Sequence, residues 1–141
     1  MIIAELLNGK SLSESTEDAI AILKSYKHHE ETLKSIEAAV ELSRSDINPA
    51  KAISHLGEGW VAEEALAIAL YCTLKENDFR KALILSVNHD GDSDSTGSIC
   101  GNIIGAFQGL DALPGDWVNQ VELKKLIVDM AGKLYDIYET V

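Results

Sequence analysis

The recurrence of apolar residues constrains the fold of this chain more than any other feature. Along nearly the whole sequence they return at the three- and four-residue spacing of an amphipathic helix, and the alternation typical of strands is almost absent. Prolines occur only at positions 49 and 114, so few points interrupt a helix. We therefore predict an all-α fold, an orthogonal helical bundle. With 141 residues, 46% of them hydrophobic, the chain can form a single helical domain over residues 1–141.

Start and stop signals divide this pattern into helices. Ser11 with Glu14 matches a capping box, although the helix could also start at Ser13, and Asn48 followed by proline is a strong helix start. The segment 61–75 is apolar nearly all round, which predicts a central position. We expect Asp116 to cap the last helical stretch. The other helices are expected at about residues 1–7, 11–25, 30–43, 49–56, 61–75, 79–88 and 95–108.

Composition excludes several classes of partner. The formal net charge of −11 disfavours nucleic acid and anionic membranes, which attract lysine and arginine. No apolar run approaches the roughly 18 residues of a membrane span. Glu5 interrupts the apolar start, so we see no signal peptide and expect a cytoplasmic protein. We expect Cys72 and Cys100 to be reduced residues of the core.

The most informative segment is the acidic loop of residues 90–96, which places three aspartates and three hydroxyl side chains between two predicted helices. Such a concentration of anions is unfavourable unless a cation or strong donors compensate it. A solvated loop whose aspartate caps a helix is the ordinary alternative. The helix that follows contains Gly97, Gly101 and Gly105, each costing roughly 1 kcal/mol against alanine. This cost indicates a geometric need, either close helix packing or a nearby ligand.

Two known motifs resemble the acidic loop only in part. In an EF-hand, Ser95 would stand where the turn glycine belongs and Gly101 where the bidentate glutamate belongs, so we reject that interpretation. The DxDxT motif of haloacid-dehalogenase phosphatases matches residues 92–96 literally. However, that chemistry needs an aspartate at the end of a buried parallel strand, and the chain shows no alternation of strands and helices. The phosphatase interpretation is therefore disfavoured.

A family resemblance accounts for more of the sequence. Residues 82–97, an apolar helix followed by His-Asp-Gly-Asp-Ser-Asp-Ser-Thr-Gly, resemble the signature near the C-terminus of ADP-ribosylglycohydrolases. Residues 101–106, Gly-Asn-Ile-Ile-Gly-Ala, are similar to the glycine-rich helix that follows it in the family. Upstream, residues 57–66, Gly-Glu-Gly-Trp-Val-Ala-Glu-Glu-Ala-Leu, resemble a second family segment that opens a helix. The two elements occur in the family's order and at its separation.

The resemblance implies an all-α enzyme with a pair of divalent cations, Mg²⁺ or Mn²⁺. It would hydrolyse the glycosidic bond that joins ADP-ribose to a protein side chain or a small acceptor, and the acceptor is left open. Carried over by position, Asp92, Asp94 and Ser95 would be metal ligands, and these hard oxygen donors suit such ions. The ions would orient the ribose hydroxyls and activate water.

The resemblance also implies a substrate-facing loop at Gly57, Gly59 and Trp60. Glycine lets backbone approach a ligand, and an aromatic ring can stack on a nucleotide. The alternative for Trp60 is an aromatic residue of the core. Four further side chains stay open between a site role and an ordinary one at a surface or helix start: His55, Glu63, Glu64 and His89.

One family element is absent. The Thr-Asp-Asp-Thr type of motif, which completes the family's metal site from its N-terminal half, does not occur here, and the chain starts as if inside a helix. We therefore expect a C-terminal half, truncated at the N-terminus relative to the family, whose catalytic residue cannot be assigned. It would be inactive alone and would need the missing N-terminal half. The alternatives are a non-catalytic module for metal or ADP-ribose and a structural helical domain. An apolar face left uncovered would cause self-association.

Overall fold

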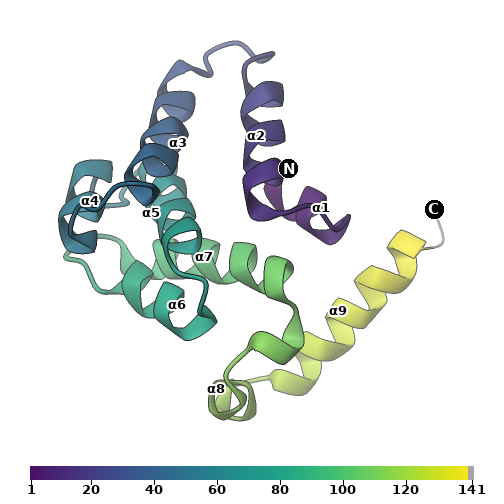
Figure 1. The fold of residues 1–141 in the computed structure, drawn as a ribbon. Coiled ribbons are helices and arrows are strands. Elements are labelled where there is room, and N and C mark those ends of the chain that lie inside the picture. The colour runs from purple at the N-terminus through teal and green to yellow at the C-terminus, as the bar shows by residue number, and fades with distance from the viewer. Residues whose placement is uncertain (140–141) are drawn as a thin grey trace.

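The computed structural model describes residues 1–139 and confirms an all-α fold, with no strand in that range (Figure 1). Most helix bounds lie within two residues of the expected ones. The elements are α1 Ile2–Leu7, α2 Leu12–Leu23, α3 Glu30–Ser43, α4 Pro49–Leu56, α5 Ala62–Lys75, α6 Phe79–Val87, α7 Ser93–Gln108, the 3-10 turn η1 Leu110–Ala112, α8 Gly115–Gln120 and α9 Lys124–Glu139. None of the described helices is both long enough and apolar enough to cross a membrane.

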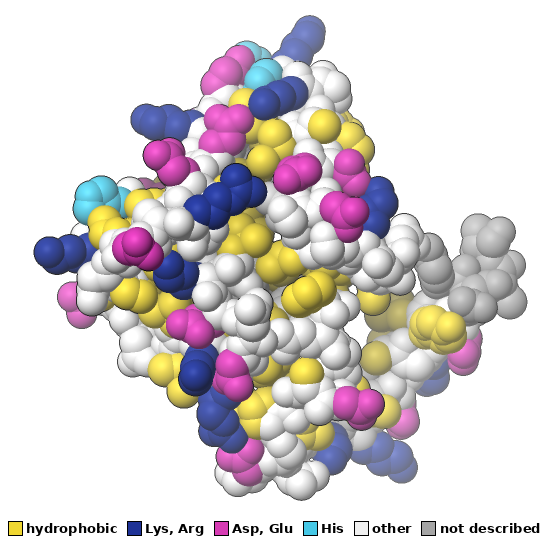
Figure 2. Space-filling view, in the orientation of Figure 1, with side chains coloured by type: hydrophobic (Ala, Val, Ile, Leu, Met, Phe, Trp, Pro, Cys, Tyr) yellow, Lys and Arg dark blue, Asp and Glu magenta, His cyan; other side chains and the backbone are white. Residues whose placement is uncertain are grey.

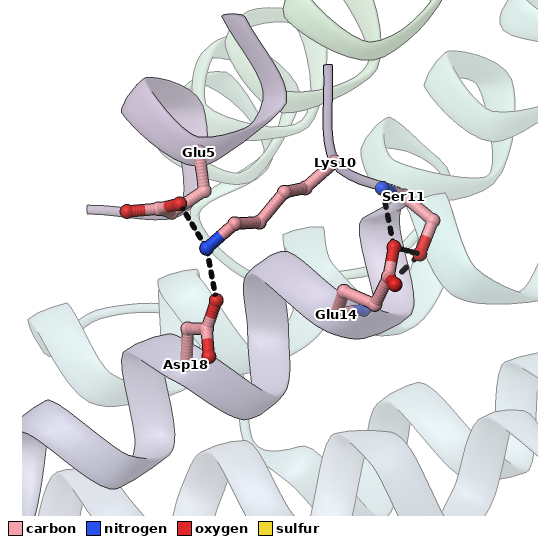
Figure 3. Close-up of polar contacts among 5 residues, drawn as sticks. All are labelled: Glu5, Lys10, Ser11, Glu14 and Asp18. Carbon is pink, nitrogen blue, oxygen red and sulfur yellow. Dashed lines mark hydrogen bonds and ion pairs between the residues drawn. The ribbon is translucent and has the colours of Figure 1, made fainter. Parts of the chain in front are cut away.

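The N-terminal helices are joined by polar contacts that the sequence partly predicts (Figure 3). The Ser11 hydroxyl accepts the Glu14 N–H at 3.2 Å, and the Glu14 carboxylate accepts the Ser11 N–H at 3.0 Å, which confirms the capping box. Lys10 in the connecting turn lies 2.6 Å from a carboxylate oxygen of Glu5 in α1 and 2.6 Å from one of Asp18 in α2. One lysine therefore bridges the two helices.

Side-chain caps also start α4 and α6. The side-chain amide oxygen of Asn48 accepts the N–H groups of Ala50 and Lys51, as predicted for an Asn-Pro start. The Asp78 carboxylate accepts the Lys81 N–H at 2.8 Å. These caps satisfy backbone donors that a helix start leaves without intrahelical partners.

Helix α5 forms the centre of the core, as its apolar composition predicted. All residues from Ala67 to Thr73 are at most 3% exposed, and α5 packs against α3, α6 and α7. In Figure 1, α7 runs across the lower end of α3 and α5. Cys72 and Cys100 lie in this core as free thiols, as expected, and burial raises the pKa of both, that of Cys100 to about 11.

The last helical stretch differs from the prediction. It is divided into α8 and α9, and Asp116 lies in the first turn of α8, where it does not cap the helix. Its carboxylate instead pairs with Arg80 of α6, whose guanidinium lies 4.3 Å from the centre of the Trp117 ring. A contact with a distant helix thus replaces the local cap. After α8 the chain is extended at Val121 and has a φ of 58° at Leu123, so one continuous helix cannot form.

Helix α9 leads away from the other helices, and hydrophobic side chains are exposed along it (Figures 1 and 2). Among the described helices its main contacts are with α8, and they are few. The half-exposed or more exposed apolar residues that follow α8 are Leu123, Leu126, Ile127, Val128, Met130, Leu134, Tyr135 and Ile137. Together they form an exposed apolar face on and just before α9.

Candidate functional site

The two segments that carry the family resemblance meet in the structure. The glycine loop, residues 57–61, joins α4 to α5, and the acidic loop joins α6 to α7. The Asp92 N–H donates to the Glu58 carbonyl oxygen at 2.8 Å. A Cβ on Gly91 would lie 1.8 Å from that same oxygen, so only glycine allows the two backbones to approach this closely. The motif shows a glycine at position 91, but its partner, 33 residues earlier, cannot be found from spacing.

Glu64 determines the conformation of the glycine loop. Its carboxylate oxygen Oε2 accepts the N–H of Glu58 at 3.1 Å and that of Gly59 at 3.0 Å. Gly57 and Gly59 have φ values of 119° and 82°, which favour glycine, and a Cβ on Gly57 would lie 2.3 Å from the Glu64 side chain. Glu64, left open by the sequence, therefore holds the loop in addition to starting α5. Glu63 is half-buried.

A buried hydrogen-bond network holds the other side of the acidic loop. The Thr96 hydroxyl, fully buried, donates to the Ser86 carbonyl oxygen at 2.6 Å. The His89 ring accepts the Gly91 N–H at Nδ1, 3.1 Å away, which leaves its proton on Nε2 to donate to the Thr96 oxygen at 2.9 Å. His89 is therefore half-buried and positions the loop, whereas His55 is exposed on α4. Sequence reasoning did not identify Thr96 in this role.

The side chains expected to bind metal lie at the start of α7. Asp92 occupies the N-cap position of α7, and no side-chain capping hydrogen bond is found there. A hydrogen bond with Asp94, which requires one proton between the two carboxyls, and next one from the Ser95 hydroxyl hold the pKa of the Asp92 carboxyl below its ordinary value. The structure thus brings the three predicted ligands together on one helical turn.

These side chains fit part of the coordination shell of a divalent cation. Two carboxylates and a hydroxyl are hard oxygen donors, and in the described part of the chain no ion pair engages Asp90, Asp92 or Asp94. Residues 1–139 contain no group of three or more His, Cys, Asp or Glu side chains that could hold a metal ion. Mg²⁺ takes about six ligands, so about half of its shell would come from elsewhere.

A cavity of about 650 Å³ lies beside the two loops. Gly57, Glu58, Trp60, His89 and Asp90 contribute to its wall, and its volume suits a small organic ligand. The Trp60 side chain is 67% exposed and its Nε1–H donates to the Glu58 carboxylate at 3.1 Å, so the alternative of a core aromatic is wrong.

The predicted site residues do not all face that cavity. Gly59 is buried, and a Cβ there would lie 3.1 Å from the Thr96 methyl group. Asp94 and Ser95 line a separate, smaller pocket of about 330 Å³ on the outer side of α7. Gly57 and Trp60 therefore line the larger cavity, whereas Asp94 and Ser95 line the smaller pocket.

The glycines of α7 bear out only part of the expected geometric need. A Cβ on Gly97 would lie 2.6 Å from the Val87 side chain, so α6 and α7 pack too closely there for alanine without a shift. At Gly101 the nearest contact would be an ordinary 3.6 Å, and at Gly105 nothing lies within 4 Å. For those two positions the expectation of close packing within this chain is wrong.

Comparisons with known proteins identify the same family that the two sequence segments resemble. A family model described as ADP-ribosylglycohydrolase matches residues 1–141. An uncharacterized protein of Archaeoglobus fulgidus is 32% identical over 120 residues, which cover 77% of this chain and 38% of that protein. Human ADP-ribosylhydrolase ARH3 is 27% identical over 109 residues, covering 70% and 30%, respectively. ADP-ribosylarginine hydrolase Tri1 of Pseudomonas putida is 32% identical over 78 residues, covering 55% and 21%. The chain thus spans less than two-fifths of these relatives' length, and no solved structure matches it.

Proposed function

Because this chain belongs to the ADP-ribosylglycohydrolase family, we propose that it contributes the metal-binding part of a site that hydrolyses the glycosidic bond of ADP-ribose. The observation that carries the proposal is the acidic loop: Asp92, Asp94 and Ser95 lie together at the start of α7, and Asp90 of the same loop lines the cavity of about 650 Å³. The loop is locked by contacts that engage its backbone and leave the two carboxylates without a cationic partner. An ordinary solvated loop does not need this degree of positioning.

In this proposal each group has a defined task. Asp92, Asp94 and Ser95 hold Mg²⁺ or Mn²⁺, one or both ions of the family's pair. The ion supplies Lewis acidity and lowers the pKa of bound water. Trp60 stacks on the substrate at the mouth of the cavity, where Gly57 lets the backbone approach. The catalytic acid or base is not assigned to a residue of this chain.

The remaining metal ligands and the catalytic group would come from a part of the family fold that these residues do not include. The proposal assigns three ligand side chains to this chain, which is about half of a six-ligand shell. The matched relatives are at least about two and a half times longer than the segment they share with this chain. The name of the Pseudomonas putida relative specifies ADP-ribosylarginine. We infer an ADP-ribosylated protein or a small ADP-ribosyl compound as the substrate class.

Calorimetric titration of ADP-ribose into the chain in the presence of Mg²⁺ or Mn²⁺ tests the proposal. We expect binding that requires the cation and is lost in the Asp92→Ala/Asp94→Ala double variant. Asp46→Ala, which removes an acidic side chain outside both loops, is the matched control and should bind normally. Binding that survives the double variant, or that does not depend on the cation, would contradict the metal-ligand assignment.

The second candidate is a non-catalytic module that binds metal or ADP-ribose. It is favoured because the described residues contain no group of three or more His, Cys, Asp or Glu side chains that could hold a metal ion. Release of ADP-ribose from an ADP-ribosylarginine peptide distinguishes the two functions. Turnover by the chain, alone or with the rest of the family fold supplied separately, supports the hydrolase. Binding without turnover in both preparations supports the module.

A further inference from the structure

Glu64 is linked to the candidate metal site through backbone alone. Its carboxylate accepts two N–H groups of the glycine loop, those of Glu58 and Gly59, at 3.1 and 3.0 Å. The carbonyl oxygen of Glu58, in the same loop, accepts the Asp92 N–H at 2.8 Å. Three hydrogen bonds thus connect a side chain on the central helix α5 to the first residue of the acidic loop expected to bind metal.

Each link in this chain of contacts is geometrically restrictive. A carboxylate that accepts two backbone N–H groups makes charge-assisted bonds, which are the stronger kind. The glycine loop has left-handed φ values at Gly57 and Gly59, so it needs an external partner to keep one conformation. At the far end, Gly91 allows the two loops to touch with no side chain between them. A displacement of Glu58 would therefore be transmitted directly to Asp92.

We propose that Glu64 is a positioning residue: it fixes the direction of the Asp92 carboxylate by holding the glycine loop against the acidic loop. The part of this inference that concerns metal rests on the function proposed above. In this proposal Glu64 acts on the backbone of the glycine loop through Oε2 and is not assigned as a ligand of the ion. Residues that orient metal ligands in this way typically change metal affinity about 10- to 100-fold when removed.

The test uses two variants of Glu64 and two readouts. Glu64→Ala removes the acceptor, whereas Glu64→Gln keeps an oxygen that can accept the same N–H groups and removes only the charge. The first readout is amide hydrogen exchange, which needs no metal. We expect exchange at Asp92 and Gly59 to accelerate at least about tenfold in Glu64→Ala, with little change at Cys100 deeper in α7. The second readout is Mn²⁺ affinity, measured by calorimetry, with a loss of about 10- to 100-fold for Glu64→Ala.

The glutamine variant separates positioning from charge. If Glu64 acts by position, Glu64→Gln should keep most of the Mn²⁺ affinity and most of the amide protection. Equal losses in the two variants would show that only the negative charge matters and would overturn the proposal. Glu63→Gln, one residue earlier on the same turn, is the matched control and should change neither readout.

Gly91→Ala tests the other end of the same link without altering Glu64. Its Cβ would push against the Glu58 carbonyl oxygen, so it should reproduce the loss of protection at Asp92 and the loss of Mn²⁺ affinity. Unchanged exchange at Asp92 in folded Glu64→Ala would refute the positioning role. If the unaltered chain binds no Mn²⁺, the proposed metal function fails, and the exchange data still decide whether Glu64 holds Asp92.

Discussion

Helices α5 and α9 have similar lengths and both carry large apolar side chains, yet the surroundings of those side chains are opposite. In α5, seven consecutive residues are at most 3% exposed, and three helices enclose them. In α9, Leu134 is 64% exposed, and the other large apolar side chains described there are about half-exposed or more. An apolar pattern therefore shows that a face tends to be buried, but it does not show what buries it. The buried residues of α5 therefore stabilise the fold, whereas the exposed face of α9 is available for contact with other molecules.

Truncation of a core side chain in α5 should have the largest effect on stability. Ile68 is fully buried, so Ile68→Ala should lower the free energy of unfolding by about 2–5 kcal/mol, because it removes apolar contacts and leaves a cavity. Leu134→Ala in α9 should change it by less than about 0.5 kcal/mol at concentrations where the chain is monomeric. Urea denaturation of both variants measures the contrast. Similar losses would mean that α9 is packed as tightly as α5.

The helices were predictable because their signals are local. Ser11, Asn48 and Asp78 each bond to N–H groups within three residues, so the sequence around them contains the whole interaction. The end of the chain was predicted less well, since Asp116 pairs with Arg80, 36 residues earlier. Spacing along the sequence carries no information about that contact.

The candidate site was likewise predictable only where its signals are local in the sequence. The family motif identifies Asp92 and Asp94 as metal ligands, and this assignment remains a prediction. The residues that position the loop could not be predicted. Gly91 packs against the Glu58 carbonyl oxygen, and His89 is hydrogen-bonded to the buried Thr96 hydroxyl. These contacts depend on how α5, α6 and α7 pack, which the motif does not specify.

Removal of the buried hydroxyl beside the acidic loop should have the next largest effect. Thr96→Val has nearly the same shape but leaves the Ser86 carbonyl and the His89 N–H without their partner, which should cost about 1–3 kcal/mol of unfolding free energy. Ser98→Ala, on the exposed side of α7, is the control and should be nearly neutral. Thermal unfolding of the two variants gives the comparison, and a neutral Thr96→Val would mean that the network does not stabilise the loop.

The exposed face of α9 should cause the chain to self-associate. Each half-exposed large apolar side chain contributes about 1 kcal/mol when a partner covers it. Ile127→Lys and Leu134→Lys should therefore each raise the dissociation constant of the dimer about tenfold. Asp129→Lys introduces a lysine on the same helix without removing an apolar side chain and serves as the control.

Sedimentation velocity over a wide concentration range measures this association. An unaltered chain that stays monomeric at every concentration would contradict the expected self-association. Weakening by the two apolar replacements and not by Asp129→Lys would show that the face of α9 is the contact, and would complete the contrast with α5. Equal weakening by all three would attribute the effect to positive charge.

The smallest effect is expected at the junction of α1 and α2, which polar contacts stabilise more than apolar burial. Ser11→Ala removes the cap of α2 and should cost about 1 kcal/mol at neutral pH. The Ser11 side chain and backbone also hold the pKa of Glu14 below its ordinary value. Because this pKa is lower in the folded protein, its contribution is present above the unfolded pKa and is lost as the pH falls through the folded one. The difference between Ser11→Ala and the unaltered chain, measured by urea denaturation, should therefore shrink between neutral and acidic pH. A difference that does not change with pH would mean that the Glu14 half of the capping box contributes nothing.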